Sequence, residues 1–244
     1  MSIKYKDIKE NDIKEKIIKS PGNIVVSGYC SVENIYKKIT PNFKQYSSNI
    51  ILLQFNEKYR KGCGILDREF NMEYLDPECP IFEETEEFIK CFNIIQTMIK
   101  NDKILSLHDR SDGGLICTLT EMSISSNIGA FVDLNGLNGL NGLNLEKENN
   151  EISNRHNLTN TNFDIMDFLF SEELGIVIEL EDKYLLEFYN EIKDTGIKYI
   201  NLGKTTEEKK LIINRGNNII DLHINKLSEK FEYTSYQLEK KQCN

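Results

Sequence analysis

Apolar residues recur every three or four positions over residues 83–100, which predicts an amphipathic helix with one face in the core. The acidic residues at 83–84 and 86–87 complement the dipole of that helix, so we interpret them as a solvated first turn and not as a metal cluster. The same spacing predicts helices over 182–193 and over 115–122, the latter directly after a pair of glycines.

Short apolar runs bounded by polar turns predict the strands. They lie at 24–29, 51–55 and 175–180, and from 199–200 to an end at Leu202-Gly203, while 104–107 has the pattern of a short strand or a helix end. The runs at 211–213 and 219–222 flank Arg215-Gly216-Asn217-Asn218, a combination typical of a β-hairpin. Short strands that alternate with helices indicate a mixed sheet with helices packed on it.

Two segments lack such a pattern. Residues 1–20 are charged, with isoleucines at intervals, and form a short helix or a linker from an upstream domain in our interpretation. Asn-Gly-Leu repeats open the segment 134–162, which is too polar to bury the surface that folding needs. We therefore expect a surface insertion there, with His156 solvated and not a ligand.

Composition excludes several classes of function. A chain of 244 residues is long enough for one large domain or two small ones, and its 39% hydrophobic residues can form a core. The net charge of −9 argues against nucleic-acid binding, which needs a basic stripe. Because no apolar run approaches ~18 residues and the N-terminus lacks a signal-peptide core, we expect a soluble, cytosolic protein that does not bind membranes.

The six cysteines, at 30, 63, 79, 91, 117 and 243, form no CxxC pair and no His-Cys spacing of a zinc site. We assign no disulfides among them. Cys117 lies in the predicted helix 115–122, where we expect a buried structural thiol and not a nucleophile.

The segment with most candidate chemistry is His108-Asp109-Arg110-Ser111-Asp112-Gly113-Gly114, between two apolar runs. Asp109 and Asp112 supply oxygen ligands that suit Mg²⁺, and Ser111 can bind a phosphate oxygen or a second metal position. Gly113 and Gly114 allow a close approach of the backbone, and amides at a helix start favour an anion.

The composition of this loop also has a purely structural interpretation. Asp and Ser before a helix are ordinary N-caps, and Gly-Gly is an ordinary turn. Short motifs match by chance often enough that the loop alone does not decide between a ligand site and a capped helix.

A longer resemblance favours the ligand site. The blocks that carry it are 20–29, 39–41, 108–115 with 120–122 and 127–130, 169–179, and 231–242. The two central blocks resemble the C-terminal domain of the ATP-dependent aminoimidazole ribonucleotide synthetase-like superfamily. The last block is similar to the stretch that follows the last synthetase-like domain in the large, single-chain phosphoribosylformylglycinamidine synthases, and the blocks 20–29 and 39–41 are similar to the opening of that domain.

This resemblance implies an α+β fold, a layered mixed sheet with helices that has partial likeness to a ferredoxin-like fold. It implies a synthetase-like domain over 21–228, and a C-terminal tail over 229–244 that leads towards a glutaminase domain. The enzymes of this family are ligases of de novo purine biosynthesis. They use ATP, Mg²⁺ and ammonia from glutamine to convert formylglycinamide ribonucleotide to formylglycinamidine ribonucleotide.

The resemblance also implies roles for single residues. Asp109 matches a Mg²⁺ ligand and Ser111 a nucleotide contact, with Gly113 and Gly114 beside them. In the family this pair belongs to a second, auxiliary nucleotide site that is structural and is not the turnover site, and the nucleotide expected is ATP or a structural ADP. His108, Arg110 and Asp112 would support the loop, and Asp112 can equally cap the helix. Glu172 and Glu173 are weaker candidates, because carboxylates at the start of a strand often bind only backbone amides or an arginine. No catalytic residue is assigned.

The chain also departs from the family pattern. It has neither the upstream synthetase-like domain nor the downstream glutaminase domain, so we expect a fragment, or one piece of a split enzyme, that is inactive alone. After the strand 51–55 the family has Leu-Gly-Gly-Ser, whereas this chain has Lys61-Gly62-Cys63-Gly64-Ile65-Leu66. That difference puts phosphate binding near 57–66 in doubt.

Two other functions stay open. A non-catalytic module could keep the loop for Mg²⁺ and nucleotide without turnover. Another ATP-dependent member of the superfamily, such as aminoimidazole ribonucleotide synthetase, selenophosphate synthetase or thiamine-phosphate kinase, would share the His108 loop. Such enzymes are not expected to end in the block 231–242, which argues against them. A pure scaffold would have no affinity for nucleotide.

Overall fold

A computed structural model describes residues 2–9, 12–19, 25–56, 58–70, 78–83, 85–135 and 165–242. Most of the expected insertion at 134–162, including His156, lies outside these residues, as do Glu84 and Cys243. The chain divides into two compact units, Met1–Ile35 and Tyr36–Asn244. Among the helices within the described ranges, none is both long and apolar enough to cross a bilayer.

The first unit contains a β-hairpin of β1 (Ser2–Lys9) and β2 (Asp12–Lys19), in which Ile8 pairs with Ile13. A helix or linker was predicted for 1–20. Isoleucines four residues apart, such as Ile13 and Ile17, fit a helix as well as one face of a strand, and cross-strand pairing decides for the strand. The strand predicted at 24–29 is wrong for its described part, because residues 25–30 are exposed and have no regular structure.

The second unit is built on a seven-stranded sheet with the order β4-β6-β3-β7-β5-β8-β9. Neighbouring strands pair antiparallel, except β5 and β8, which run parallel. The strands are β3 (Asn49–Gln54), β4 (Ile104–Arg110), β5 (Gly129–Asp133), β6 (Gly175–Leu180), β7 (Lys198–Thr206), β8 (Lys210–Arg215) and β9 (Asn218–His223). The predicted mixed sheet and the hairpin at 211–222 are confirmed.

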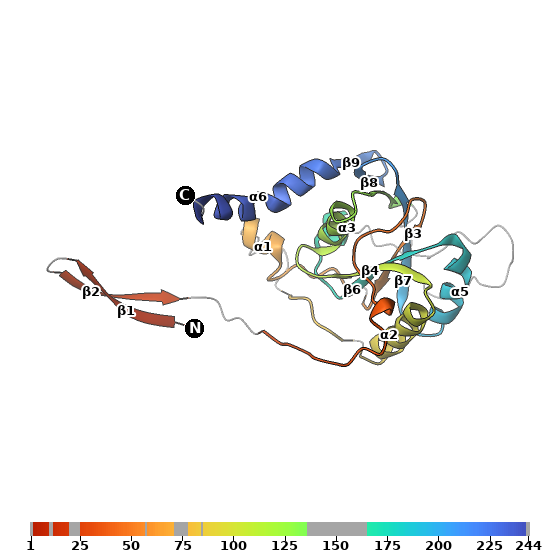
Figure 1. Ribbon diagram of the computed structural model, residues 1–244, viewed down its shortest axis with the longest axis horizontal. Helices are drawn as coiled ribbons and strands as arrows, with labels where there is room; N and C mark the ends of the chain where they lie inside the picture. Colours follow the sequence, from red (N-terminus) through yellow and green to blue (C-terminus); the bar gives the residue numbers. More distant parts are fainter. Residues whose placement is uncertain are drawn as a thin grey trace. The chain divides into compact units, whose positions relative to one another are not determined.

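Helices cover both faces of this sheet (Figure 1). The helices in the described residues are η1 (Ile35–Lys37), α1 (Ile65–Phe70), α2 (Thr85–Lys100), α3 (Gly114–Ile124), α4 (Ile165–Phe170), α5 (Asp182–Ile192) and α6 (Ile224–Gln242), of which α2, α3, α4 and α5 supply the covering side chains. Buried side chains of α3 and α4 form one core with the sheet, and those of α2 and α5 form a second core on its other face.

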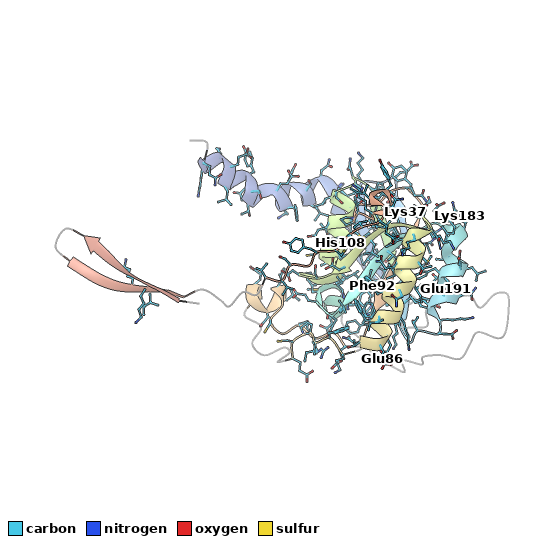
Figure 2. The ribbon with its side chains drawn as sticks, turned by 60° about the horizontal axis from the view of Figure 1, so that its bottom comes forward. Lys37, Glu86, Phe92, His108, Lys183 and Glu191 are labelled. Atoms are coloured by element: carbon cyan, nitrogen blue, oxygen red, sulfur yellow. The ribbon has the colours of Figure 1, made fainter. Side chains whose placement is uncertain are left out.

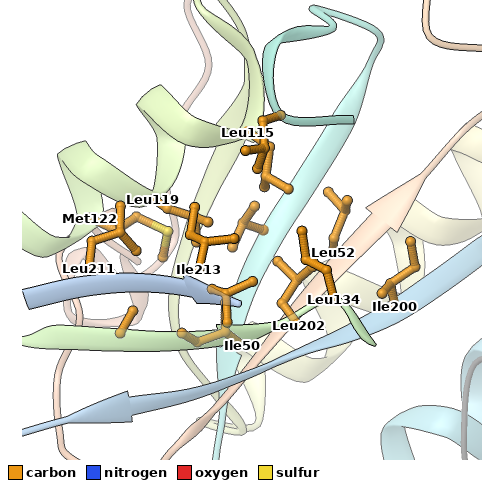
Figure 3. Close-up of a cluster of buried hydrophobic side chains, with 14 of the residues drawn as sticks. Ile50, Leu52, Leu115, Leu119, Met122, Leu134, Ile200, Leu202, Leu211 and Ile213 are labelled. Atoms are coloured by element: carbon orange, nitrogen blue, oxygen red, sulfur yellow. The ribbon is translucent and has the colours of Figure 1, made fainter. Parts of the chain in front are cut away.

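The central strand β3 explains this layered arrangement. Ile50 and Leu52 belong to the core on the α3 face, while Ile51 and Leu53 belong to the core on the α2 face. A strand covered on both sides reads as a continuous apolar run, as 50–53 does. Figure 3 shows Ile50 and Leu52 together with Leu115, Leu119 and Met122 of α3 and with Leu211 and Ile213 of β8.

The start of α2 and the course of α6 bear on two of the predicted boundaries. Glu83 lies before α2, which begins at Thr85, and pairs with Lys58 at 3.0 Å and Arg60 at 3.4 Å, so it is not a solvated first-turn acid. The domain boundary predicted between residues 228 and 229 lies within α6, which runs without interruption from Ile224 to Gln242, and the assignment of 229–244 as a tail stays a prediction. That stretch has no Gly or Pro, so nothing local ends the helix.

Candidate functional site

The segment His108–Gly114, called here the His108–Gly114 loop, comprises the last three residues of β4, at an edge of the sheet, the turn 111–113 and the first residue of α3. Its side chains separate into a buried and an exposed set. Asp109, Ser111 and Asp112 are exposed, and the Asp109 side chain keeps 68% of its surface open. Arg110 is buried, with 2% exposure. The candidate metal and nucleotide contacts therefore face solvent, while the residue between them enters the protein.

The backbone at Asp109 is held from two sides. Its carbonyl accepts a hydrogen bond from the Thr118 hydroxyl at 3.1 Å, and the Nδ1 atom of His108 lies 2.8 Å from the same oxygen. The other imidazole nitrogen, Nε2, lies 2.9 Å from Oε2 of Glu121 in α3 (His108 is labelled in Figure 2). His108 thus ties the end of β4 to α3, as expected of a residue that supports the loop.

Arg110 anchors the loop to the start of β6. Its Nε donates to the Glu173 carbonyl, and one terminal nitrogen donates to the Leu174 carbonyl at 3.4 Å. Burial lowers the pKa of the Arg110 guanidinium to about 10, against the attraction of Tyr59 and Glu173. The side chain passes over Gly175, where an added Cβ would lie 3.1 Å from Nε.

An internal carboxylate occupies the start of α3. Oε1 of Glu172 accepts the backbone N–H of Gly113 at 2.8 Å and that of Ile65, the first residue of α1, at 2.9 Å. The Gly114 amide donates to the Ser111 carbonyl at 3.0 Å. Both glycine amides, which were expected to face an outside anion, therefore donate within the chain.

The two glycines are required by close packing. A Cβ at Gly113 (φ +82°) would lie 2.3 Å from Sγ of Cys117, and one at Gly114 (φ +72°) would lie 2.7 Å from the Leu169 carbonyl oxygen. Gly113 is also the N-cap residue of α3, with no side-chain cap, so Asp112 does not occupy the capping position. Glu172, from a distant part of the chain, supplies the acceptor that a local cap would have supplied.

Glu173 is fully buried and is neutralised by Arg60. The Nε of Arg60 donates to Oε1, a terminal nitrogen donates to Oε2 at 2.9 Å, and the Asn56 amide donates to Oε2 at 2.6 Å. These contacts with Glu173 raise the pKa of the Arg60 guanidinium. The alternative interpretation of Glu172 and Glu173, that they bind backbone amides and an arginine, matches these contacts.

The structure adds residues that the sequence did not single out. Arg60 and Asn56 bind Glu173, and the Lys61 ammonium pairs with Asp167 of α4. Three segments thus meet at the start of α3: residues 56–65, the His108–Gly114 loop and residues 171–175. The segment 57–66, where phosphate binding was in doubt, contributes ion pairs and the Ile65 amide.

Cys117 is half-buried beside this junction. Burial raises the pKa of its thiol, and the carboxylates of Glu121, Glu172 and Asp112 raise it further. A thiol in such surroundings is a poor nucleophile, which agrees with the structural role predicted for it.

The donor set for a metal is small. Within the described ranges, no three His, Cys, Asp or Glu side chains gather closely enough to hold an ion. An exposed carboxylate and an exposed hydroxyl two residues apart still suit Mg²⁺, which keeps several waters and takes one or two carboxylates together with phosphate oxygens. Asp109 and Ser111 fit that limited role.

Comparison with known proteins agrees with this architecture. The family model described as AIR synthase related protein, C-terminal domain, matches residues 80–215. Phosphoribosylformylglycinamidine synthase from Dictyostelium discoideum is 29% identical over 96% of this chain, and the Homo sapiens protein of that name is 26% identical over 93%. The chain spans 17% and 16% of the lengths of these two relatives.

Solved structures show the same fold. Phosphoribosylformylglycinamidine synthase II from Thermotoga maritima aligns with a TM-score of 0.56 at 12% identity, and covers 78% of this chain and 27% of its own. PurL from the same organism, complexed with FGAR, aligns with a TM-score of 0.60 at 12% identity, over 79% of this chain and 30% of its own. The chain belongs to the AIR synthase related family and contains the C-terminal domain of that family.

Proposed function

We propose that this chain is the C-terminal synthetase-like domain of a large-type phosphoribosylformylglycinamidine synthase. The whole enzyme would convert formylglycinamide ribonucleotide to formylglycinamidine ribonucleotide in purine biosynthesis, with ATP and glutamine as co-substrates. The names of the relatives and the order of the matching blocks support this assignment. Because the chain spans about a sixth of those relatives, the other synthetase-like domain and the glutaminase would lie in other parts of the enzyme. The cytoplasmic location expected from the sequence is part of the same proposal.

The chemistry requires an activated amide. ATP transfers its terminal phosphoryl group to the amide oxygen, ammonia adds to the carbon, and phosphate leaves with that oxygen. A bound Mg²⁺ would neutralise charge on the phosphates. In our proposal the Asp109 carboxylate holds Mg²⁺, and the Ser111 hydroxyl donates to a phosphate oxygen of ATP or of a structural ADP. Gly113 and Gly114, which were also expected beside the nucleotide, are buried and their amides donate within the chain, so in our proposal they contribute the shape of the turn that presents Ser111.

One observation carries the proposal: contacts within the protein hold the backbone of the loop, while its polar contact groups face solvent. The carbonyl of Glu173, just before β6, accepts a hydrogen bond from Arg110, and residues of α3 contact His108 and the Asp109 carbonyl. The Asp109 carboxylate and Ser111 remain open to solvent. Ligand sites are built this way, with exposed contact groups on a backbone whose position other interactions fix.

The test is thermal unfolding with and without Mg²⁺ plus ADP or ATP. A ligand at ~100 times its Kd stabilises the folded state by about 2.7 kcal/mol, which is a Tm rise of roughly 5–10 °C for a domain of this size. We expect that rise in the wild type and its loss in Asp109→Ala. The matched control is Asp194→Ala, which removes another exposed aspartate outside the loop and should keep the rise.

The outcomes are distinct. A rise in the wild type and in Asp194→Ala, but not in Asp109→Ala, supports the nucleotide site. If no variant shows a rise, or if Asp109→Ala responds like the wild type, the loop is not a Mg²⁺-nucleotide site in this chain.

A non-catalytic Mg²⁺-nucleotide module is the second candidate. The internal use of both glycine amides favours it, because it leaves fewer groups to stabilise a transferring phosphoryl. Such a module would bind nucleotide without consuming it. Phosphate release by the complete enzyme, compared between the wild type and Asp109→Ala, separates a catalytic site from a structural one. If the site is structural, Asp109→Ala lowers stability but has little effect on turnover per folded molecule.

A further inference from the structure

Two cysteine thiols meet at the surface beside α1. The Cys79 thiol donates to the Cys63 sulfur with the two sulfur atoms 3.0 Å apart, although the residues are 16 positions apart in sequence. Cys63 is exposed and Cys79 is partly exposed. A reagent in solution can therefore reach this pair.

The backbone on both sides of the pair is held in place. The Gly62 amide donates to the Glu78 carbonyl at 3.1 Å, which joins the two segments one residue before each cysteine. The Gly64 amide closes a turn on the Lys61 carbonyl at 3.1 Å, and the Cys63 amide donates to Asp67 Oδ2 at 3.2 Å. The approach of the sulfurs thus follows from fixed backbone contacts and not only from side-chain rotation.

The other thiols differ in their surroundings. Cys91 is fully buried and Cys117 is half-buried, and burial raises the pKa of both thiols. Thiol oxidation proceeds through the thiolate and needs access to solvent. Exposure and proximity therefore coincide at Cys63 and Cys79 but not at Cys91 or Cys117.

We propose that Cys63 and Cys79 are a redox-sensitive dithiol, which a low-molecular-weight disulfide such as oxidised glutathione converts to an intramolecular disulfide. The thiolate of Cys63, the more exposed residue, attacks one sulfur of the oxidant and releases one thiolate. The Cys79 thiolate then attacks the Cys63 sulfur of this mixed disulfide and releases the second. The protein loses two electrons and two protons, and one oxidant molecule becomes two thiols.

The cross-link would act on the junction described above. It closes the chain from residue 63 to residue 79, which includes α1, whose first amide donates to Glu172. Gly64 also packs on Glu172, because a Cβ there would lie 3.2 Å from its carboxyl carbon. Oxidation would therefore hold the start of α1 against the carboxylate that also binds the start of α3.

The test combines alkylation, peptide mass mapping and unfolding, after incubation of the protein with oxidised glutathione. We expect Cys63 and Cys79 to lose alkylation together and to appear in one cross-linked peptide that dithiothreitol separates. Closing a loop of this length should raise Tm by roughly 6–12 °C. Cys79→Ser should leave Cys63 as a mixed disulfide with glutathione, without the rise.

The control is Cys30→Ser, an exposed cysteine in the other unit, which should oxidise like the wild type. A stable glutathione adduct at Cys63 in the wild type, or a cross-link to any other cysteine, would overturn the proposal. A cross-link without a rise in Tm would contradict the expectation that the disulfide stabilises the segment that includes α1. None of these outcomes depends on nucleotide binding, so the result is independent of the proposed function.

Discussion

The Glu172 carboxylate accepts the backbone N–H of Gly113 at 2.8 Å, although 59 positions separate the two residues in the chain. The same oxygen accepts the Ile65 amide at 2.9 Å, so one acid serves the first turns of two helices. An anion is favoured at such a position because the amides of a first turn have no partner within the helix. The glycine loop thus receives its anion from within the protein.

Replacement of Glu172 should destabilise the fold. Glu172→Ala leaves two amides without their charged acceptor, so we expect a loss of about 2–4 kcal/mol in the free energy of unfolding. Glu172→Gln keeps an acceptor oxygen but not the charge, so it should lose roughly half as much. Urea denaturation measures both variants.

Glu207→Ala removes an exposed acid on the same domain and should change stability by less than about 0.5 kcal/mol. If Glu172→Ala matched this control, the two amide contacts would not contribute to stability.

Gly114→Ala should be strongly destabilising, since the added Cβ would lie 2.7 Å from the Leu169 carbonyl oxygen and 2.8 Å from the Phe170 Cα. The positive φ alone costs about 1–3 kcal/mol for a residue other than glycine. Backbone atoms of α4 must also move, so the total should exceed that range. The change in Tm is the measurement.

Gly216→Ala is the matched control, because Gly216 also has a positive φ (+59°) but its Cβ would meet nothing within 4 Å. It should show the conformational cost alone. Equal losses at positions 114 and 216 would contradict the packing explanation for Gly114.

The buried Cys91 thiol predicts a loss of stability at alkaline pH. Burial raises its pKa to about 12 from 9.0. Below pH 9.0 the thiol is neutral in the folded and the unfolded chain, so the free energy of unfolding does not depend on its ionisation. Between pH 9.0 and about 12 it ionises only in the unfolded chain, which lowers the free energy of unfolding. Over that range the free energy of unfolding falls by up to ~1.4 kcal/mol per pH unit because of this group.

Urea denaturation of the wild type and of Cys91→Ala, at about neutral pH and at about pH 10, isolates this contribution. The variant should be less stable at both values because of the cavity, but its stability should fall less as the pH rises. Parallel decreases in the two proteins would show that Cys91 does not contribute to the alkaline transition.

Local pattern predicted much of the sheet and its helices. The 3.6-residue spacing of apolar positions in α2 and α5 and the turn residues between β8 and β9 were sufficient, because these elements form between neighbours in sequence. The pattern failed at β1 and β2, where the isoleucine spacing fits a helix as well as a strand. The boundary at residue 228 came from the resemblance and not from a local stop signal, and it stays a prediction, although α6 runs across it.

The sequence by itself determined the candidate residues of the His108–Gly114 loop, and its resemblance to a family determined the roles that we propose for them. Only the tertiary structure decided that Arg110 points inward, that Glu172 occupies the amides of Gly113 and Ile65, and that Arg60 neutralises Glu173. The physical reason is the separation in sequence between the interacting residues. Periodicity reports contacts between residues a few positions apart, whereas a buried charge or an open helix end can find its partner anywhere in the chain.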